Sequence, residues 1–268
     1  MGKLAGKVAI ITGSSMGIGK VLARQMAEAQ VRVVLNARNE QRLQKSLADM
    51  QAQGYDMHAI AADVSKEEGV RRLIEGTIQH YGRLDYLINN AGISMEGTLE
   101  ELDSAVFQKL MDVNVMGSVI PTQIALPQLR KNRGSVIFIG SVAGIRGIPG
   151  YSPYSASKMA LTAIAESLKS ELDGSGVHVG IAYVGFTEND PQKTIYDKSG
   201  QIIPQPKRDF IKAESPENVA RRIISMIKNR RFKQVFTPLG KINAWMNRFF
   251  PRIVDFVLTR NFKKRNAG

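Results

Sequence analysis

The fold is decided by the stretch Thr12-Gly13-Ser14-Ser15-Met16-Gly17-Ile18-Gly19. An apolar run at residues 8–11 precedes it and predicts a buried strand, and a helical pattern at 17–29 follows. Glycines at such a junction let the backbone turn sharply and approach a pyrophosphate, whose charge suits the helix N-terminus. The GxxxGxG spacing differs from the more familiar GxGxxG, and a merely structural glycine turn is the alternative.

Apolar runs and helical patterns alternate along most of the chain. Further strands are expected at residues 31–35, 57–61, 86–88, 136–139, 177–183 and 234–237, and further helices at 40–53, 66–81, 105–130, 154–172 and 216–228. This repetition implies parallel strands with right-handed crossovers, and the short apolar strands indicate a sheet covered on both faces. The pattern predicts an α/β fold, a single doubly wound parallel sheet of about seven strands with ligands at the strands' carboxyl ends.

Composition limits the classes of protein that the chain can be. Its 268 residues suit one large α/β domain better than two small ones, and a hydrophobic content of 43% can fill a core. There is no cysteine, and the three histidines are scattered without ligand spacing, so we expect no metal site. The first residues lack an apolar signal core and no run approaches the length of a membrane span, which favours a cytoplasmic protein.

The residues after the second predicted strand bear on the choice of nucleotide. Dinucleotide enzymes that prefer NAD usually place an acid there for the ribose hydroxyls, whereas an arginine accommodates a 2′-phosphate. Here Asn36 takes the place of the acid, and Arg38 follows two residues later. The sequence therefore predicts NADP(H). The alternative is that Arg38 is a solvated surface residue.

Two further strand ends contribute candidate cofactor contacts. Asp63 follows the third strand, where its carboxylate could bond the adenine amino group or could equally cap the next helix. The stretch Asn89-Asn90-Ala91-Gly92 ends the fourth strand, where small residues admit a cofactor and Asn90 can bond backbone across the sheet; a plain turn is the alternative. The predicted cofactor-binding residues are Gly13, Ser14, Ser15, Gly17, Ile18, Gly19, Arg38, Asp63, Val64, Asn90, Ala91, Gly92, Tyr154, Lys158, Gly185 and Thr187.

A tyrosine and a lysine lie four residues apart in Tyr154-Ser155-Ala156-Ser157-Lys158, thirteen residues after Ser141. Side chains four apart share one face of a helix. An ammonium beside a phenol favours the phenolate, so that a group with an ordinary pKa of about 10 can exchange protons near neutral pH. Tyr151 is a nearby competitor, but Ser155 rather than a lysine stands four residues after it.

Five motifs occur together in one order. They are TGxxxGIG, NNAG, an asparagine before a helix bend (Asn114), the serine of Gly140-Ser141-Val142-Ala143-Gly144, and YxxxK. This set resembles the short-chain dehydrogenase/reductase family over about residues 6–237. The resemblance implies a Rossmann fold and a redox enzyme.

The resemblance also implies roles for four catalytic residues. Tyr154 is the general acid in reduction and the general base in oxidation, and Lys158 lowers its pKa and bonds the nicotinamide ribose. Ser141 donates a hydrogen bond to the substrate oxygen. Asn114 holds a water that joins Lys158 to a proton relay. Taken singly, the serine could cap a turn, the lysine could be a solvated charge, and the asparagine could bond within its helix.

One segment departs from the family pattern. After the sixth strand the family usually reads Pro-Gly with a threonine a few residues on, whereas here Val184 precedes Gly185. Depending on the alignment, Thr187 or Asn189 takes the place of the threonine, and the nicotinamide contact could come from either. The missing proline also reduces the rigidity of the loop.

Residues 187–214 are the least regular stretch and predict a loop that closes over the substrate. Apolar surface is offered by Phe186, Tyr196, Ile202, Ile203 and Phe210, while Asp190, Lys193 and Lys198 are expected to be solvated. This composition favours a lipophilic carbonyl or alcohol as the substrate. The same residues could simply pack the loop onto the body.

The net charge of +13 is concentrated near the C-terminus, where residues 228–268 hold eleven Lys or Arg and one acid, Asp255. We therefore expect a catalytic domain at 1–240 and a basic amphipathic extension at 241–268, with Pro251 between two short helices. Apolar and aromatic residues interleaved with cations favour peripheral contact with an anionic membrane through 241–265. Packing on the body or on a partner subunit is the alternative. No nucleic acid partner is expected, because no recognition motif accompanies the charge.

The sequence thus predicts an NADP(H)-dependent oxidoreductase that interconverts a ketone and a secondary alcohol on a lipophilic substrate. One alternative is a 3-oxoacyl-[acyl-carrier-protein] reductase, since an acidic carrier would suit a basic surface. Another is a weakly active cofactor-binding adaptor at a membrane or protein surface. The resemblance further implies a homodimer or homotetramer formed through the helices at 105–130 and 154–172.

Overall fold

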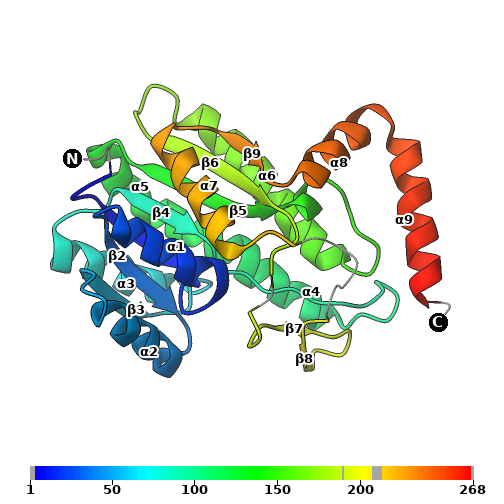
Figure 1. Ribbon diagram of the computed structural model, residues 1–268, viewed down its shortest axis with the longest axis horizontal. Coiled ribbons are helices and arrows are strands. Elements are labelled where there is room, and N and C mark those ends of the chain that lie inside the picture. The colour runs from blue at the N-terminus through cyan, green and yellow to red at the C-terminus, as the bar shows by residue number, and fades with distance from the viewer. Residues whose placement is uncertain (1–3, 189, 207–212, 267–268) are drawn as a thin grey trace.

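A seven-stranded parallel sheet forms the centre of the computed structural model (Figure 1). The structure describes residues 4–188, 190–206 and 213–266, with residues 265 and 266 described by their backbone only. The strand order is β3-β2-β1-β4-β5-β6-β9. The strands are β1 (Val8–Thr12), β2 (Arg32–Ala37), β3 (Met57–Ala61), β4 (Tyr86–Asn89), β5 (Ser135–Ser141), β6 (His178–Val184) and β9 (Lys233–Val235). The expected doubly wound sheet is confirmed.

Helices cover both faces of this sheet. The helices of the described residues are α1 (Gly17–Glu28), α2 (Glu40–Gln51), α3 (Glu67–Tyr81), α4 (Ser104–Leu110), α5 (Gly117–Asn132), α6 (Ser152–Glu171), α7 (Pro216–Lys228), α8 (Pro238–Phe249) and α9 (Pro251–Asn266). Helices α1, α2 and α7 pack on one face, and α3, α5 and α6 on the other. Strand side chains alternate between the two cores, as Ala9 and Ile11 join one while Ile10 joins the other.

The prediction of a single uninterrupted helix at 105–130 is wrong, because the helix is interrupted near its middle. A π-helical turn, η1 (Met111–Met116), separates α4 from α5. Such turns insert one extra residue into a helix and rotate its face, and they occur often at functional sites. The sequence shows only an uninterrupted helical pattern there, so the spacing of apolar residues does not predict this turn.

The stretch expected to be an irregular loop contains a short antiparallel hairpin, β7 (Thr194–Tyr196) and β8 (Ile202–Pro204). Its connection is built around Asp197, whose carboxylate accepts bonds from the main-chain N–H groups of Ser199 and Gln201. Gly200 supplies the positive φ, +87°, that the turn requires. Strands of three residues are too short to show a period.

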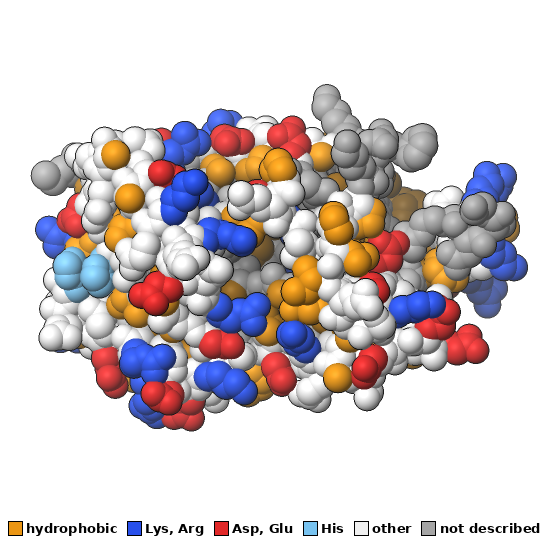
Figure 2. Space-filling model, turned by 90° about the horizontal axis from the view of Figure 1, so that it is seen from below, with side chains coloured by type: hydrophobic (Ala, Val, Ile, Leu, Met, Phe, Trp, Pro, Cys, Tyr) orange, Lys and Arg blue, Asp and Glu red, His pale blue; other side chains and the backbone are white. Residues whose placement is uncertain are grey.

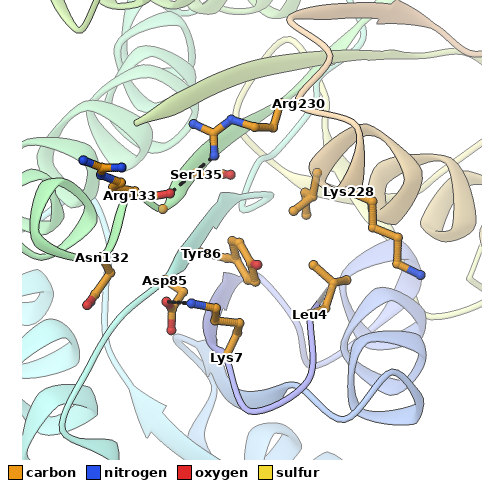
Figure 3. Close-up of a pocket in the computed structure, with 11 residues that line it drawn as sticks. Leu4, Lys7, Asp85, Tyr86, Asn132, Arg133, Ser135, Lys228 and Arg230 are labelled. Atoms are coloured by element: carbon orange, nitrogen blue, oxygen red, sulfur yellow. Dashed lines mark hydrogen bonds and ion pairs between the residues drawn. The ribbon is translucent and has the colours of Figure 1, made fainter. Parts of the chain in front are cut away.

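The order of the strands reverses between β3-β2-β1 and β4-β5-β6, so the carboxyl ends of β1 and β4 flank the switch point. Ligands of doubly wound sheets bind at this point. A cavity of about 290 Å³ lies at the opposite, amino ends of the strands (Figure 3). Two of the cations that line it are engaged, because Lys7 pairs with the buried Asp85 and Arg230 donates to the carbonyl of Arg133.

Helices α8 and α9 extend past the β9 edge of the sheet, and α9 stands apart from the body (Figure 1). They confirm the two helices expected on either side of Pro251. Across the described residues, no helix combines the length and the apolar character that crossing a bilayer demands.

Candidate active site

The glycine loop is held against the end of β4. Gly13 has a φ of +63°, and a Cβ there would lie 2.8 Å from the Cα of Ala91, so no larger residue fits. The amide of Asn90 donates to the carbonyl of Thr12 at 2.8 Å and to that of Gly13 at 3.0 Å. Thr12 Oγ1 in turn accepts from the main-chain N–H groups of Asn90 and Ala91. The prediction that Asn90 bonds backbone across the sheet is confirmed.

The first residue of α1 offers its N–H to an anion. Gly17 has a φ of +55°, and the space where its Cβ would stand is open for 4 Å. Its N–H donates to the Asp190 carboxylate at 3.1 Å. A carboxylate thus lies where a helix N-terminus would bind a phosphate oxygen, and the loop fits the pyrophosphate of a dinucleotide. Asp190 is therefore not simply solvated, as the sequence had indicated.

The end of β2 differs in detail from the expectation. Asn36 is buried, and its amide donates to the carbonyls of Ile60 and Ala62 at 3.1 and 3.2 Å, so it faces β3. Its main-chain N–H donates to Ser14 Oγ at 2.9 Å. The side chains of Asn36 and Ser14 therefore brace the sheet, and Arg38 beyond them is exposed.

Asp63 does not cap the next helix, because the cap position belongs to Lys66. Its carboxylate accepts bonds from the N–H and hydroxyl of Ser65 at 2.9 and 2.7 Å. Burial opposes ionisation of Asp63, but these hydrogen bonds, aided by the charge of Arg38, lower its pKa. The adjacent Val64 is buried.

A second arginine, which the sequence reading missed, lies over the glycine loop. Arg42 Nη1 is 3.3 Å from the sulfur of Met16. It stands in the first turn of α2, whose cap Asn39 accepts the main-chain N–H of Arg42 at 2.8 Å. Because Arg42 falls inside a helical pattern, only the fold shows that it reaches the nucleotide loop.

Lys158 is buried beneath the site with 5% of its surface exposed. Its ammonium donates to the carbonyl of Ile139 at 2.9 Å and lies 5.7 Å from the centre of the Tyr154 ring. Burial, and secondarily the positive charge of Lys193, lowers the pKa of Lys158 to about 8. The tyrosine and lysine therefore share one face of α6, as their spacing predicts.

Asn114 lies in the π-helical turn. Its amide donates to the carbonyl of Ile93 at 3.0 Å and to Ser157 Oγ at 2.9 Å, and its oxygen accepts the N–H of Ile93 at 2.8 Å. A Cβ on Gly92 would lie 3.2 Å from Asn114 Oδ1 and 3.5 Å from Lys158 Nζ. Three motifs far apart in the sequence thus meet at one point.

Ser141 ends β5, opposite Val184 on β6. Its Oγ accepts the N–H of Ala143 at 3.2 Å and so caps the short turn at Val142–Gly144. A hydroxyl that accepts one bond still has its own proton to donate, so the capping role leaves a substrate role open. Beyond Val184, Gly185 packs on Thr237, and Thr187 Oγ1 donates to the carbonyl of Gly185 at 3.4 Å.

Apolar side chains line the region beside Tyr154. Met95, Val106 and Leu110 form a small core, against which Ile93, Leu102, Tyr154 and Tyr196 pack. The hairpin closes this cluster, because Tyr196 exchanges main-chain bonds with Ser94 and Glu96 at 3.0 and 2.9 Å. Lys198, expected to be solvated, pairs with Glu101 at 2.6 Å. Ile202 is exposed, and Asn189 and Phe210 lie outside the described residues.

Comparison with known proteins agrees with this geometry. The family model for short chain dehydrogenase matches residues 7–200. The 11-beta-hydroxysteroid dehydrogenase A of Sesamum indicum is 36% identical over 95% of this chain and 75% of its own length. The 3-ketodihydrosphingosine reductase of Bos taurus is 33% identical over 82% of this chain and 68% of its own.

Two solved structures share the fold. One is a short-chain dehydrogenase/reductase from Burkholderia phymatum in complex with NAD (TM-score 0.82, 23% identity, 94% of this chain and 96% of that chain). The other is an alcohol dehydrogenase from Thermococcus sibiricus complexed with 5-hydroxy-NADP (TM-score 0.74, 26% identity, 85% and 95%).

The chain belongs to the short-chain dehydrogenase/reductase family. It is accordingly an oxidoreductase that acts between ketones and alcohols with a nicotinamide cofactor.

Proposed function

We propose that this protein is an NADP(H)-dependent oxidoreductase that interconverts a ketone and a secondary alcohol on a lipophilic molecule. The observation that carries the proposal is the meeting of Tyr154, Lys158 and Asn114 around Gly92, beside a glycine loop that already binds a carboxylate. Tyr154 and Lys158 lie on α6 and Asn114 lies on η1, so separate elements meet here, and a buried lysine is rare outside functional sites and ion pairs.

The preference for NADP(H) rests on two arginines. Arg38 follows β2 and acts on Asp63, and Arg42 reaches Met16 on the glycine loop. Guanidinium groups bind phosphate through paired hydrogen bonds, and no carboxylate ends β2 to hold the ribose hydroxyls. The related structures include both an NAD and a 5-hydroxy-NADP complex, so the arginines, rather than the relatives, support this choice.

Each catalytic residue has a proposed task at a stated atom. In reduction, Tyr154 Oη gives its proton to the oxygen of the carbonyl, and in oxidation it takes the proton back. Ser141 Oγ donates a hydrogen bond to the same oxygen and stabilises the charge that develops there. The Lys158 ammonium favours the phenolate form of Tyr154. When bound, the nicotinamide accepts or supplies the hydride.

Asn114 and the cofactor loop complete the proposal. The amide of Asn114 fixes Ile93 and Ser157 around Lys158, which positions the lysine for a proton relay that ends in a bound water. The nucleotide would be held by the remaining predicted residues of the glycine loop and of the ends of β3, β4 and β6, including Gly185 and Thr187. Val184 at the place of the usual proline leaves the contact from Thr187 the least constrained of these.

A lipophilic substrate is supported by the apolar surroundings of Tyr154. Met95, Val106 and Leu110 are buried beside it, and the partly buried rings of Tyr154 and Tyr196 pack against them. An apolar molecule gains free energy when it leaves water for such surroundings. The names of the sesame and bovine relatives, a hydroxysteroid dehydrogenase and a ketodihydrosphingosine reductase, point to lipid substrates. A carbonyl on a steroid-like or long-chain molecule is the substrate class we propose.

Assembly into a homodimer or homotetramer is a further part of the proposal. Met116 and Met159 are exposed, by 41% and 37%, on the helices expected to meet a second copy. Met116 ends η1 directly before α5, and Met159 lies on α6, so these apolar side chains favour a subunit contact through this part of the two helices.

The test is a fluorescence titration of the wild-type chain with NADPH and with NADH, followed by turnover on ketones of increasing lipophilicity. Tighter binding of NADPH and a rate that rises with lipophilicity would support the proposal. A preference for NADH would remove the NADP(H) part, and binding of neither nucleotide would favour the adaptor alternative.

A further inference from the structure

The two C-terminal helices carry most of the large apolar side chains that the described part of the chain leaves exposed. Eight of the twelve such residues lie between Pro238 and Val257. We call them the tail face: Leu239, Ile242, Trp245, Phe249, Phe250, Ile253, Phe256 and Val257. Their exposed fractions range from 44% for Phe250 to 66% for Phe256. Exposed apolar side chains that are grouped in this way mark interaction surfaces.

The spacing of these residues places them on continuous stripes. In α8 they recur at intervals of three or four residues, and in α9 Ile253, Phe256 and Val257 do the same. Other positions of the two helices face the body of the protein, since Gly240 of α8 and Val254 of α9 are buried. The ring of Trp245 contacts the rings of Phe249 and Phe250, with ring centres 5.5 Å apart in each pair. The tail face is therefore an ordered aromatic surface.

Cations surround the tail face, and among the described residues of α8 and α9 no acid is unpaired. The exposed cations are Lys241, Arg248, Arg252, Arg260, Lys263 and Lys264. The one acid of these helices, Asp255, is paired with Arg146 of the body. Figure 2 shows Lys and Arg side chains on the end of the molecule to which α9 projects. The surface is thus apolar in the middle and positive at the rim.

We infer that the tail face docks on an anionic lipid surface, with its aromatic residues at the level of the headgroups. Amphipathic helices with aromatic apolar faces and basic flanks lie in membrane interfaces in this manner. A second copy of the chain is a poorer occupant, because a two-fold contact would bring the two cationic rims together. The docking is peripheral, since α8 and α9 have only 12 and 16 residues.

The tail is tied to the segment that follows Ser141. Asn247 donates to the carbonyl of Ile145 at 3.3 Å and accepts from Arg146 at 3.0 Å, while Arg146 also pairs with Asp255. Docking would therefore hold the substrate side of the enzyme next to the bilayer, where a lipophilic ketone is most concentrated. The delivery of substrate rests on the proposed function, whereas the docking rests only on the tail face.

The experiment is co-sedimentation of the full chain with vesicles of phosphatidylcholine alone and of phosphatidylcholine mixed with phosphatidylserine. We expect binding to the mixed vesicles and release at high salt. The double variant Phe249→Ser/Phe256→Ser should weaken binding by roughly tenfold or more. Leu99→Ser, which removes an equally exposed apolar residue from the body, is the matched control and should bind like the wild type.

The inference is overturned if the chain stays in the supernatant with mixed vesicles, or if the double variant binds as the wild type does. It is also overturned if the double variant instead dissociates an oligomer in light scattering, because the tail face would then be a subunit contact. NADPH oxidation with the ketones of increasing lipophilicity separates the two proposals: its absence with every ketone, in a chain that binds vesicles, removes the proposed function and leaves the docking intact.

Discussion

The ammonium of Lys158 donates a hydrogen bond to the main-chain carbonyl of Ile139, 2.9 Å away and two residues before Ser141 on the same strand. This bond fixes the lysine beneath the site by the strand that also carries the serine. The relative positions of the two candidate catalytic groups therefore depend on β5, a fully buried strand, rather than on a loop.

The buried lysine predicts a rise in stability at alkaline pH. Its pKa is about 8 in the folded protein against an ordinary 10.5, so the unfolded chain binds more protons between these values. The free energy of unfolding should therefore rise with pH across this window, by at most on the order of 3 kcal/mol from this group. Urea unfolding of the cofactor-free wild type and of Lys158→Met would show the rise in the wild type alone; equal pH dependence would contradict it.

The two arginines predict the nucleotide preference. Arg38→Ala and Arg42→Ala should each weaken NADPH binding, by roughly tenfold if a guanidinium–phosphate pair is lost, and should change NADH binding much less. Arg72→Ala is a suitable control, since Arg72 pairs with Glu68 on the surface of α3. Fluorescence titration measures all three variants. An unchanged NADPH/NADH ratio in both arginine variants would remove the basis for NADP(H).

We expect that replacing Asp190 gives a variant that binds the cofactor more tightly. Its carboxylate accepts the N–H of Gly17, where the pyrophosphate should lie, so the nucleotide has to displace it. Asp190→Asn removes the competing charge and should lower the dissociation constant for NADPH by roughly twofold to fivefold, the size of a charge effect at a helix N-terminus. Weaker binding would show instead that the carboxylate supports the nucleotide site.

We expect burial of His178 to make the stability of the folded protein sensitive to acid. Its Nδ1 lies 3.2 Å from Ser135 Oγ and its Nε2 lies 3.1 Å from the carbonyl of Arg231, contacts that suit a neutral ring. Burial lowers the pKa of His178 to about 4, so the unfolded chain binds the extra proton between pH 6.5 and 4. Stability should fall as the pH falls through that window, by on the order of 3 kcal/mol at most.

Thermal unfolding of His178→Gln, compared with the wild type, checks this. The pH dependence between 4 and 6.5 should be flatter in the variant than in the wild type. A wild-type slope retained by His178→Gln would assign the acid sensitivity to other groups.

The sheet was predictable from the sequence because its signals are local. Buried strands such as β1, expected at 8–11 and observed at Val8–Thr12, are runs of apolar residues, and the glycines of the loop that follows indicate a turn by their residue type. The spacing of Tyr154 and Lys158 predicted correctly that they share one face of a helix, since side chains four residues apart are neighbours on it.

What escaped prediction depends on contacts between distant segments. The bond from Gly17 to Asp190 joins residues 173 positions apart, and that from Arg42 to Met16 depends on how α2 packs beside the loop. The inward turn of Asn36 follows from the register of β2 on β3, which a single strand does not reveal. The π-helical turn around Asn114 leaves no trace in a pattern of apolar residues.

The most direct test of the proposed function is the rate of NADPH-dependent ketone reduction by Tyr154→Phe, compared with Tyr151→Phe. Both changes remove one hydroxyl near the start of α6, and unchanged thermal unfolding would show that each variant folds. We expect Tyr154→Phe to bind NADPH but to lose at least roughly a hundredfold in turnover, as loss of a general acid requires. Tyr151→Phe should stay active. Turnover retained by Tyr154→Phe would contradict the account.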